Sequence, residues 1–199
     1  MRLLPELLEN GHEIICAVRD KNRLSLDPET TRKVTVIEID FAEVINYDSF
    51  PKDIDAAYYL IHSMSGSTKN FDEVEAQSAE NFNKYMASTS VKQVIYLSGI
   101  INQDELSKHL SSRKQVEEIL YKGDFHLTVL RAGIVVGSGS SSFEIIRDLC
   151  EKLPVMIAPK WLKTKIQPIA IRDVIAFLSG VLGNEKCFDQ SFDIGGPDV

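Results

Sequence analysis

Residues 1–20 carry the sequence MRLLPELLENGHEIICAVRD, and this stretch decides the fold. Leucines recur at helical spacing over residues 3–8, and the pair Asn10-Gly11 is typical of a helix end. The almost continuous apolar run that follows, residues 12–18, predicts a buried strand. A helix that leads into such a strand is the second part of a βαβ unit. The stretch therefore predicts that a strand and a tight loop belong before it.

The rest of the chain continues this alternation of strands and helices. Apolar runs predict strands over residues 33–40, 55–64, 91–99, 125–137, 164–171 and 190–196. Capped or amphipathic stretches predict helices over residues 67–89, 109–123, 141–153 and 172–183. Strands that are apolar on both faces are typical of parallel sheets covered by helices. We expect one α/β domain over residues 1–199, a Rossmann-like doubly wound and mostly parallel sheet with helices on both faces.

Composition and charge exclude several classes of protein. A net charge of −7 argues against nucleic acid as a partner, because phosphate binding favours a basic surface. No apolar run approaches the roughly 20 residues that span a bilayer, and no signal peptide is recognised, so we expect no membrane partner and a cytoplasmic protein. The cysteines Cys16, Cys150 and Cys187 lack metal-binding or disulfide spacing, and no metal site is predicted. Cys16 is expected to be a small core residue.

Ligands of doubly wound sheets bind beyond the carboxyl ends of the strands, so the residues there are candidates. Arg19 is suited to a nucleotide 2′-phosphate, or is simply a solvated arginine at a strand end. Asp40 and Phe41 are suited to adenine, by accepting from its amino group and packing on its ring. Alternatively, Asp40 caps the next turn. His62 is expected to be a neutral loop residue, and Ser98 either donates to a substrate carbonyl or only ends a strand.

Two further stretches have more than one interpretation. The loop GSGSSS at residues 137–142 lacks the lysine and the glycine spacing of phosphate-binding loops, so we expect a substrate-side loop instead. Trp161 lies within a cluster of lysines, and the cluster lines a substrate pocket, forms a partner surface or is only a solvated basic patch. The lysines are Lys160, Lys163 and Lys165.

Several motifs together resemble the atypical short-chain dehydrogenase/reductase group. They are YYLIHSM, QVIYLSG, LRAGIVVGSGS, LPVMIAPKWLKTKIQPIAIRDV and FDIGGPDV. The chain is most similar to NAD(P)-binding proteins of the nucleoside-diphosphate-sugar epimerase type, and more distantly to NmrA-like proteins. The resemblance covers essentially the whole chain. Members of the group begin with a strand and a glycine-rich loop, and this chain is expected to start just after that loop.

The resemblance implies a set of cofactor-binding residues. It assigns Arg19 to the 2′-phosphate and Asp40 with Phe41 to adenine, which favours NADP, with NAD as the alternative. The residues that it places along the ribose are Ile61, His62 and Ser63. Those that it places on the nicotinamide side are Arg131, Ala132, Gly133 and Ile134.

The catalytic positions implied by the resemblance depart from the pattern of the group. Active members use a serine on the strand and a Tyr-x-x-x-Lys motif on the next helix. Ser98 matches the serine, whereas His109 and Arg113 stand at the tyrosine and lysine positions. A histidine has a suitable pKa for proton transfer, but an arginine does not lose its proton. The departure puts hydride transfer by the usual mechanism in question.

The absent first strand leaves a predicted gap between residues 12–18 and 55–61, because that strand lies at the centre of the sheet. Three hypotheses fill it: the flanking strands close up and pair, a segment of a second copy enters in a homodimer, or the natural protein starts upstream of Met1. Without the glycine loop, we expect weak or no dinucleotide binding by this chain.

The sequence as a whole predicts an NAD(P)-dependent oxidoreductase or a sugar-nucleotide epimerase-like protein. The alternative is a non-catalytic dinucleotide-binding sensor or assembly module, which the residues His109 and Arg113 favour. The small-molecule substrate is not identified by the sequence.

Overall fold

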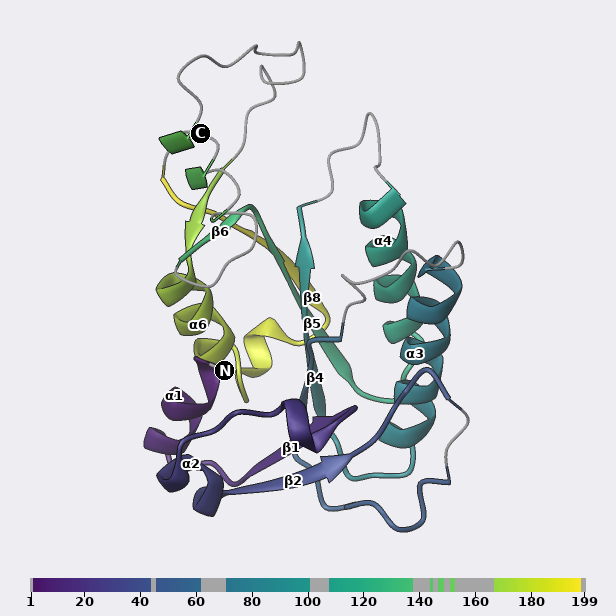
Figure 1. The fold of residues 1–199 in the computed structure, drawn as a ribbon. Helices are drawn as coiled ribbons and strands as arrows, with labels where there is room; N and C mark the ends of the chain where they lie inside the picture. The colour runs from purple at the N-terminus through teal and green to yellow at the C-terminus, as the bar shows by residue number, and fades with distance from the viewer. Residues whose placement is uncertain are drawn as a thin grey trace.

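The computed structural model describes residues 2–43, 46–61, 71–100, 108–137, 144, 147–148, 151–152 and 167–197. Within these residues the strands form a four-stranded parallel sheet, a two-stranded parallel sheet and a short third pair (Figure 1). The α/β fold with mostly parallel strands and flanking helices confirms the fold class predicted from the sequence.

The four-stranded sheet has the order β3-β4-β5-β8, and every neighbouring pair is parallel. Its strands are Ala56–Tyr59 (β3), Gln93–Gly99 (β4), His126–Ala132 (β5) and Gln190–Ile194 (β8). The helices α3 (Phe71–Met86) and α4 (Lys108–Leu120) cover one face, and α6 (Ile171–Gly180) covers the other (Figure 1). The parallel order explains why the β4 and β5 sequences are apolar on both faces.

The amino-terminal half of the fold forms a separate sheet. Its strands are β1 (Ile14–Val18) and β2 (Val34–Glu38), which pair in parallel. The crossover between them holds the 3₁₀ turn η1 (Lys21–Arg23) and the short helix α2 (Pro28–Lys33). The sequence analysis did not predict α2, although Asp27 before Pro28 is a recognisable start signal. The Asp27 carboxylate accepts from the Glu29 and Thr30 amides, as an N-cap residue does.

The helix predicted at the amino terminus is present as α1 (Leu3–Glu9). It ends at Asn10, and Gly11 adopts a φ of 81°, in the left-handed region that favours glycine. The Asn10 side-chain amide donates to the Ser179 hydroxyl at 3.2 Å, which links the end of α1 to α6.

Two apolar cores stabilise the two faces of the four-stranded sheet. The core on the α3 and α4 side contains Tyr59, Phe82, Val94 and Leu120, and Ile39 just after β2 extends it. The core on the α6 side is formed by another set of side chains, which includes Ile95, Leu130, Ala132, Val174, Leu178 and Ile194.

The strand predicted over residues 125–137 is divided in the structure. β5 ends at Ala132, and β6 (Val135–Val136) pairs with β7 (Ile169–Ala170) in a different sheet. Gly133 lies at the break, where a Cβ atom would stand 1.9 Å from the Gln167 carbonyl oxygen. Only a glycine permits this close approach of two backbone segments. The helix predicted over residues 141–153 is described at residues 144, 147–148 and 151–152, which are helical.

The gap predicted beside the amino-terminal strand is present. Among the described strands, β1 pairs only with β2 and β3 only with β4. A cavity of about 1900 Å³, here called the inter-strand cavity, is lined by residues of both β1 and β3. The hypothesis that the flanking strands close up and pair is therefore wrong for this structure. The physical reason is anchoring on two sides: α1 packs on α6, and Phe41 after β2 packs on α3.

In the ranges that the structure describes, no helix is both long and apolar enough to cross a membrane. Within the same ranges, no group of three or more histidine, cysteine, aspartate or glutamate residues has the geometry to hold a metal ion.

Candidate functional site

The carboxyl ends of β3, β4, β5 and β8 meet at one edge of the four-stranded sheet. The strand registers align Gly99 with Ala132 and Ala132 with Ile194, and β3 ends beside Tyr96. This is the edge at which doubly wound sheets bind their ligands. The structure thus brings together the ends of β4 and β5, from which the sequence analysis selected Ser98 and residues 131–134.

Ser98 is the most informative residue at this edge. It lies on β4 with 2% of its surface exposed, and its Oγ atom makes no hydrogen bond of good geometry among the described residues, since its interaction with the Tyr96 hydroxyl falls outside those limits. A buried hydroxyl without a partner is uncommon, because each unsatisfied polar group costs free energy. A ligand or an ordered water that approaches the end of β4 therefore finds a donor and acceptor already in place.

Arg113 lies directly beside the end of β4. A Cβ atom built on Gly99 would stand 3.9 Å from Cδ and 4.0 Å from Nη1 of Arg113. The side chain of Arg113 therefore passes over the residue that follows Ser98, and it is partly exposed. Of the three predicted catalytic residues, Ser98 and Arg113 thus lie at the same end of β4, with Gly99 between them in the contact. The third, His109, has its backbone in the first turn of α4, and its side chain lies outside the described part.

Tyr96 joins this pair, and the sequence analysis did not select it. Its hydroxyl donates to the Arg113 carbonyl oxygen at 3.4 Å, and the ring is 3% exposed. Burial raises the pKa of Tyr96 to about 12, although the neighbouring Ser98 hydroxyl and the Arg113 charge act to lower it. Tyr96 stays protonated at neutral pH. Its place in the sequence could have indicated this, because Tyr96 is two residues before Ser98 and residues two apart on a strand share a face.

Arg131, predicted on the nicotinamide side, is held by an ion pair. Its Nε and Nη2 atoms donate to the Glu117 carboxylate at 3.2 and 2.5 Å, and its Nη1 atom lies 3.9 Å from Asp193. The hydrogen bond to Glu117 raises the pKa of Arg131 above its usual value. The guanidinium therefore links β5 to α4 and β8. The cofactor role of Arg131 stays a prediction.

The segment after Arg131 is fixed mainly through its backbone. Ala132 is 6% exposed, and the Gly133 amide donates to the Ile194 carbonyl at 3.3 Å. The Ile134 carbonyl accepts from the Ile169 amide at 2.9 Å. These bonds hold the exit of β5 against both β8 and β7. The segment offers a rigid wall at the edge of the sheet.

The residues predicted to bind the adenosine end lie on the amino-terminal half. Arg19 is exposed and directly follows β1. Asp40 caps the next turn, since its Oδ1 atom accepts from the Ala42 amide at 3.0 Å, as the alternative interpretation expected. Phe41 is 6% exposed and packs on Phe82 and Tyr85, at ring-centroid distances of 5.6 and 6.2 Å. The faces of this ring are thus in contact with the core.

The remaining predicted site residues lie at the limit of the described structure. Ile61 follows β3 and is 37% exposed. His62, Ser63, Trp161 and the neighbouring lysines lie outside the described residues, as does the 137–142 loop apart from Gly137.

A family model described as NAD(P)H-binding matches residues 1–148. No curated protein matches the sequence.

Solved structures share the fold of the chain at low sequence identity. The Bordetella bronchiseptica enzyme WbmG, in complex with NAD and UDP, is 16% identical with a TM-score of 0.70 over 97% of this chain and 67% of its own. A putative NAD-dependent epimerase/dehydratase from Bacillus halodurans is 17% identical with a TM-score of 0.72, over 99% of this chain and 88% of its own.

A third similar structure is the UDP-glucuronic acid 4-epimerase from Bacillus cereus, in complex with UDP-glucuronic acid and NAD. It is 14% identical with a TM-score of 0.72, over 99% of this chain and 74% of its own. These likenesses show that the two sheets and their helices follow a fold common to all three proteins.

Proposed function

Because the chain belongs to the NAD(P)H-binding family, of the atypical short-chain dehydrogenase/reductase type, we propose that it is an NAD(P)-dependent oxidoreductase or a nucleotide-sugar epimerase-like protein. The ligands present in the similar structures support a nucleotide sugar as the substrate class. WbmG holds UDP together with NAD, and the Bacillus cereus epimerase holds UDP-glucuronic acid with NAD.

The observation that carries the proposal is the buried Ser98 hydroxyl, which makes no hydrogen bond of good geometry and precedes the residue that Arg113 covers. This serine stands at the carboxyl end of a central parallel strand, where its Oγ atom can donate to a carbonyl or accept from a hydroxyl of a substrate. A nicotinamide dinucleotide, when bound, supplies the hydride chemistry. The part of the chain is to orient the reacting group against Ser98 and to exclude water from it.

The neighbours of Ser98 have separate roles in this proposal. A guanidinium is not a proton-transfer group, so Arg113 is proposed to hold a ribose hydroxyl or a phosphate oxygen. His109 is the proposed proton donor and acceptor, because imidazole titrates near neutral pH. Tyr96 stays protonated and fixes the backbone of Arg113 through its hydroxyl.

The exposed position of Arg19 at the end of β1 supports NADP over NAD in the proposal, because a guanidinium there pairs with a 2′-phosphate. Ile61 is proposed to lie along the ribose, and residues 131–134 are proposed to line the nicotinamide side.

Nicotinamide fluorescence during titration with NADPH and NADH tests cofactor binding, and a Ser98→Ala variant tests the site. In a chain extended at its amino terminus, we expect Ser98→Ala to lower turnover of nucleotide sugars or carbonyl compounds by about 10²-fold or more, with little change in cofactor affinity. Unchanged turnover in Ser98→Ala would exclude the proposed role of Ser98. A chain extended at its amino terminus that binds neither dinucleotide would contradict the function itself.

A second candidate is a non-catalytic dinucleotide-binding sensor or assembly module. The residues that favour it are His109 and Arg113, which replace the acid/base pair of active members of the group. The two candidates differ in one measurement. Steady NADPH oxidation with any member of a carbonyl panel excludes the non-catalytic module.

A further inference from the structure

The pair Asn10-Gly11 at the end of α1 lies at the amino end of the strands, away from the site described above. Asn10 is the only asparagine in the sequence that a glycine follows. Both residues are exposed, and nothing stands within 4 Å of a Cβ atom built on Gly11. Gly11 thus has no side chain that shields its nitrogen, and open space lies where one would be. The side-chain amide of Asn10 is therefore next to an unhindered backbone nitrogen, which is the nucleophile of asparagine deamidation.

The folded helix end holds this pair in an unreactive geometry. Asn10 has a ψ of 4°, which turns the Gly11 nitrogen toward the backbone nitrogen of Asn10 and away from its side chain. The Gly11 amide donates to the Leu8 carbonyl at 3.0 Å, and the Asn10 side-chain amide donates to the Ser179 hydroxyl at 3.2 Å. Both reacting groups are thus occupied, so the reaction requires the end of α1 to open first.

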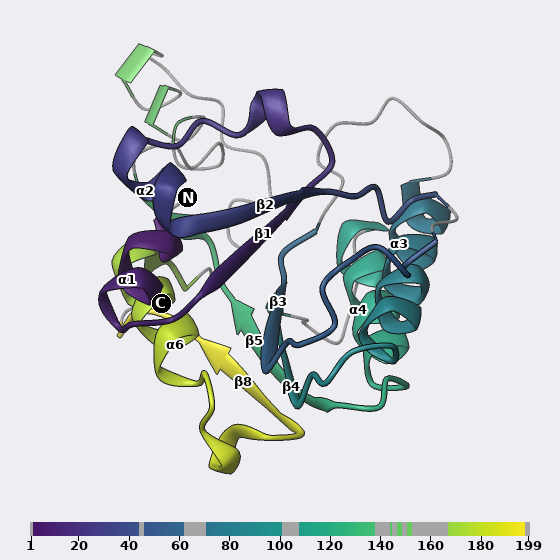
Figure 2. The same cartoon turned by 90° about the horizontal axis from the view of Figure 1, so that it is seen from below.

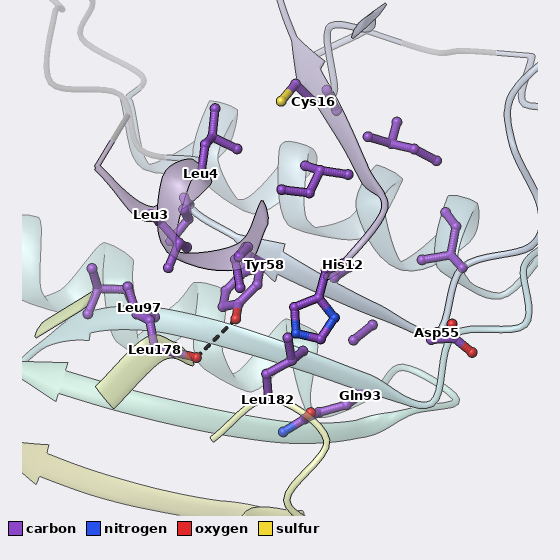
Figure 3. A pocket seen from close by; sticks show the side chains of 18 of the residues that line it. Leu3, Leu4, His12, Cys16, Asp55, Tyr58, Gln93, Leu97, Leu178 and Leu182 are labelled. Atoms are coloured by element: carbon purple, nitrogen blue, oxygen red, sulfur yellow. Dashed lines mark hydrogen bonds between the residues drawn. The ribbon is translucent and has the colours of Figure 1, made fainter. Parts of the chain in front are cut away.

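The attachment of α1 to the rest of the fold is limited, so its end opens readily. The helix has seven residues, and Leu7 is the one that is buried. Isolated helices shorter than roughly 12 residues are marginal in water, so α1 depends on its packing. It lies beside α6 in Figure 2, with the bond between Asn10 and Ser179 at its end. At its start, Leu3 packs in the core that contains Leu178 (Figure 3).

We propose that Asn10 is a deamidation site that reacts when the end of α1 opens, and that the reaction weakens the attachment of α1 to α6. In the opened state the Gly11 nitrogen attacks the Asn10 Cγ atom, and the new N–Cγ bond closes a succinimide ring. The Cγ–Nδ2 bond breaks, and ammonia leaves with the proton from the Gly11 nitrogen. Water then adds to one of the two ring carbonyls and opens the ring to aspartate or isoaspartate. The net reaction consumes water and releases ammonia.

Neither product restores the original contact. A carboxylate has no proton to donate to the Ser179 hydroxyl. Its negative charge also stands at the carboxyl end of a helix, where the backbone carbonyls already carry partial negative charge. Isoaspartate adds a carbon to the backbone, which displaces the Gly11 amide from the Leu8 carbonyl. We therefore expect the amide hydrogens of α1 to exchange faster after the reaction.

The first test follows the folded 199-residue chain during incubation at mildly alkaline pH, with tryptic peptides analysed by mass spectrometry. The peptide of residues 3–19 contains Asn10 as its only side-chain amide, and the peptide of residues 173–186 contains only Asn184. Asn184 is a matched control, because it is exposed and adjoins a glycine of positive φ, Gly183, on its other side. We expect Asn10 to become a carboxyl residue faster than Asn184 by about tenfold or more.

A pair of serine variants tests whether the helix end controls the rate. Ser179→Ala removes the acceptor of the Asn10 amide, whereas Ser191→Ala removes an exposed hydroxyl contact between β8 and Tyr121. We expect Ser179→Ala to speed deamidation of Asn10 about two- to tenfold, the factor that one hydrogen bond contributes. Ser191→Ala should leave the rate unchanged. In urea, where the helix end is open, both variants and the original chain should react equally fast.

The product is made directly as the variant Asn10→Asp. We expect the amide hydrogens of residues 7–9 to exchange about two- to tenfold faster in this variant, because a hydrogen bond is lost and a charge opposes the helix dipole. Asn184→Asp is the control, since the Asn184 side chain accepts from the Lys186 amide and an aspartate keeps that bond. Exchange at residues 7–9 should not change in the control.

Three outcomes would overturn the proposal. Equal rates for Asn10 and Asn184 in the folded chain would show that Asn10 is not a deamidation site. Equal rates for Ser179→Ala and the original chain in the folded state would show that the contact with α6 does not control the reaction. Unchanged exchange in Asn10→Asp would show that the reaction leaves α1 attached. All three measurements are made without dinucleotide or substrate, so their results are independent of the proposed function.

Discussion

The two sheets differ in how completely their strands are covered, although their sequences are similarly apolar. In the four-stranded sheet, β4 and β5 pair on both edges, and most of their residues are buried. In the two-stranded sheet, every second residue of β1 is exposed, and the rest are only partly buried. The sequences IICAV and QVIYL both predict a central strand. They differ in pairing: β4 has a neighbouring strand on each edge, whereas β1, among the described strands, has one on a single edge.

This comparison teaches that an apolar run indicates a strand suited to burial between two neighbouring strands. It does not indicate whether both neighbours are present in the structure. β1 carries the composition of a strand buried on both faces, but it borders the inter-strand cavity. The two-stranded half is held by its ends, through the packing of α1 on α6 and of Phe41 on α3. We expect the two halves to respond very differently to the same substitution.

The largest difference is expected for isoleucine to alanine in the two halves. Ile95 on β4 is fully buried, and Ile15 on β1 is 38% exposed. Ile95→Ala should lower the free energy of unfolding by about 2–5 kcal/mol, because it leaves a cavity in a closed core. Ile15→Ala should lower it by less than about 1 kcal/mol. Urea denaturation of both variants measures the two values. Equal losses would show that β1 is as well packed as β4.

A smaller difference is expected for the ion pairs of the two halves. Glu117, whose side chain is 8% exposed, pairs with Arg131 in the larger half, whereas Glu29 pairs with Lys33 on the exposed surface of α2. Glu117→Gln should cost about 1–3 kcal/mol, because it removes the nearer of the two carboxylates that face the partly buried Arg131 guanidinium. Glu29→Gln should leave the urea midpoint unchanged within error. A larger effect of Glu29→Gln would mean that α2 is integral to the fold.

Glycine to alanine changes give a third and still smaller contrast. Gly11 ends α1 with a φ of 81°, and Gly180 ends α6 without a positive φ; nothing lies within 4 Å of a Cβ atom at either position. Only the backbone decides the outcome. Gly11→Ala should cost about 1 kcal/mol, and Gly180→Ala should be neutral or slightly stabilising. Thermal unfolding followed by circular dichroism gives both values. If Gly180→Ala destabilises the protein and Gly11→Ala does not, then Gly180, and not Gly11, is the position whose backbone requires glycine.

Much of the fold was predictable because its signals are local. Residues 12–18 and 91–99 carry apolar runs, and Asn10-Gly11 carries a helix end, so the corresponding elements were confirmed within a few residues. The helix α2 was missed because it is short and polar, with an Asp27 N-cap as its only signal. The division of the strand after Ala132 was not predictable, since it depends on the approach of Gln167 from a distant part of the chain.

The site was less predictable than the fold because it depends on which side chains face one another. Ser98 and Arg113 were selected from their places in motifs, and the structure places Arg113 against Gly99, the residue that follows Ser98. Tyr96 escaped selection, since an aromatic residue within an apolar strand is normally a core residue. The ion pair of Arg131 with Glu117 joins a strand to a helix whose relative position no local pattern gives.

The pH dependence of stability gives the smallest expected effect, and it concerns the larger half alone. Asp189 stands before β8 with a φ of 56°, and its carboxylate accepts from the Leu127 amide at 3.1 Å and lies 2.7 Å from His126 Nδ1. The hydrogen bond with His126 lowers the pKa of Asp189. A carboxyl whose pKa is lower in the folded state stabilises the fold above its unfolded pKa of about 3.9. That contribution is lost as the pH falls through the lower folded value.

Asp189→Asn tests this contribution, because asparagine tolerates the same left-handed backbone. The side chains of Asp189 and His126 are each more than half exposed, so solvent screening keeps the expected loss below about 1 kcal/mol at pH 6. Urea midpoints of the original protein and of the variant should differ at pH 6 and converge as the pH falls below the lowered folded pKa of Asp189. A difference that persists at the acid end would assign the effect to the backbone of residue 189, and not to its charge. Since β5 and β8 both begin at this contact, convergence would also show that acid weakens the closed sheet at its amino end.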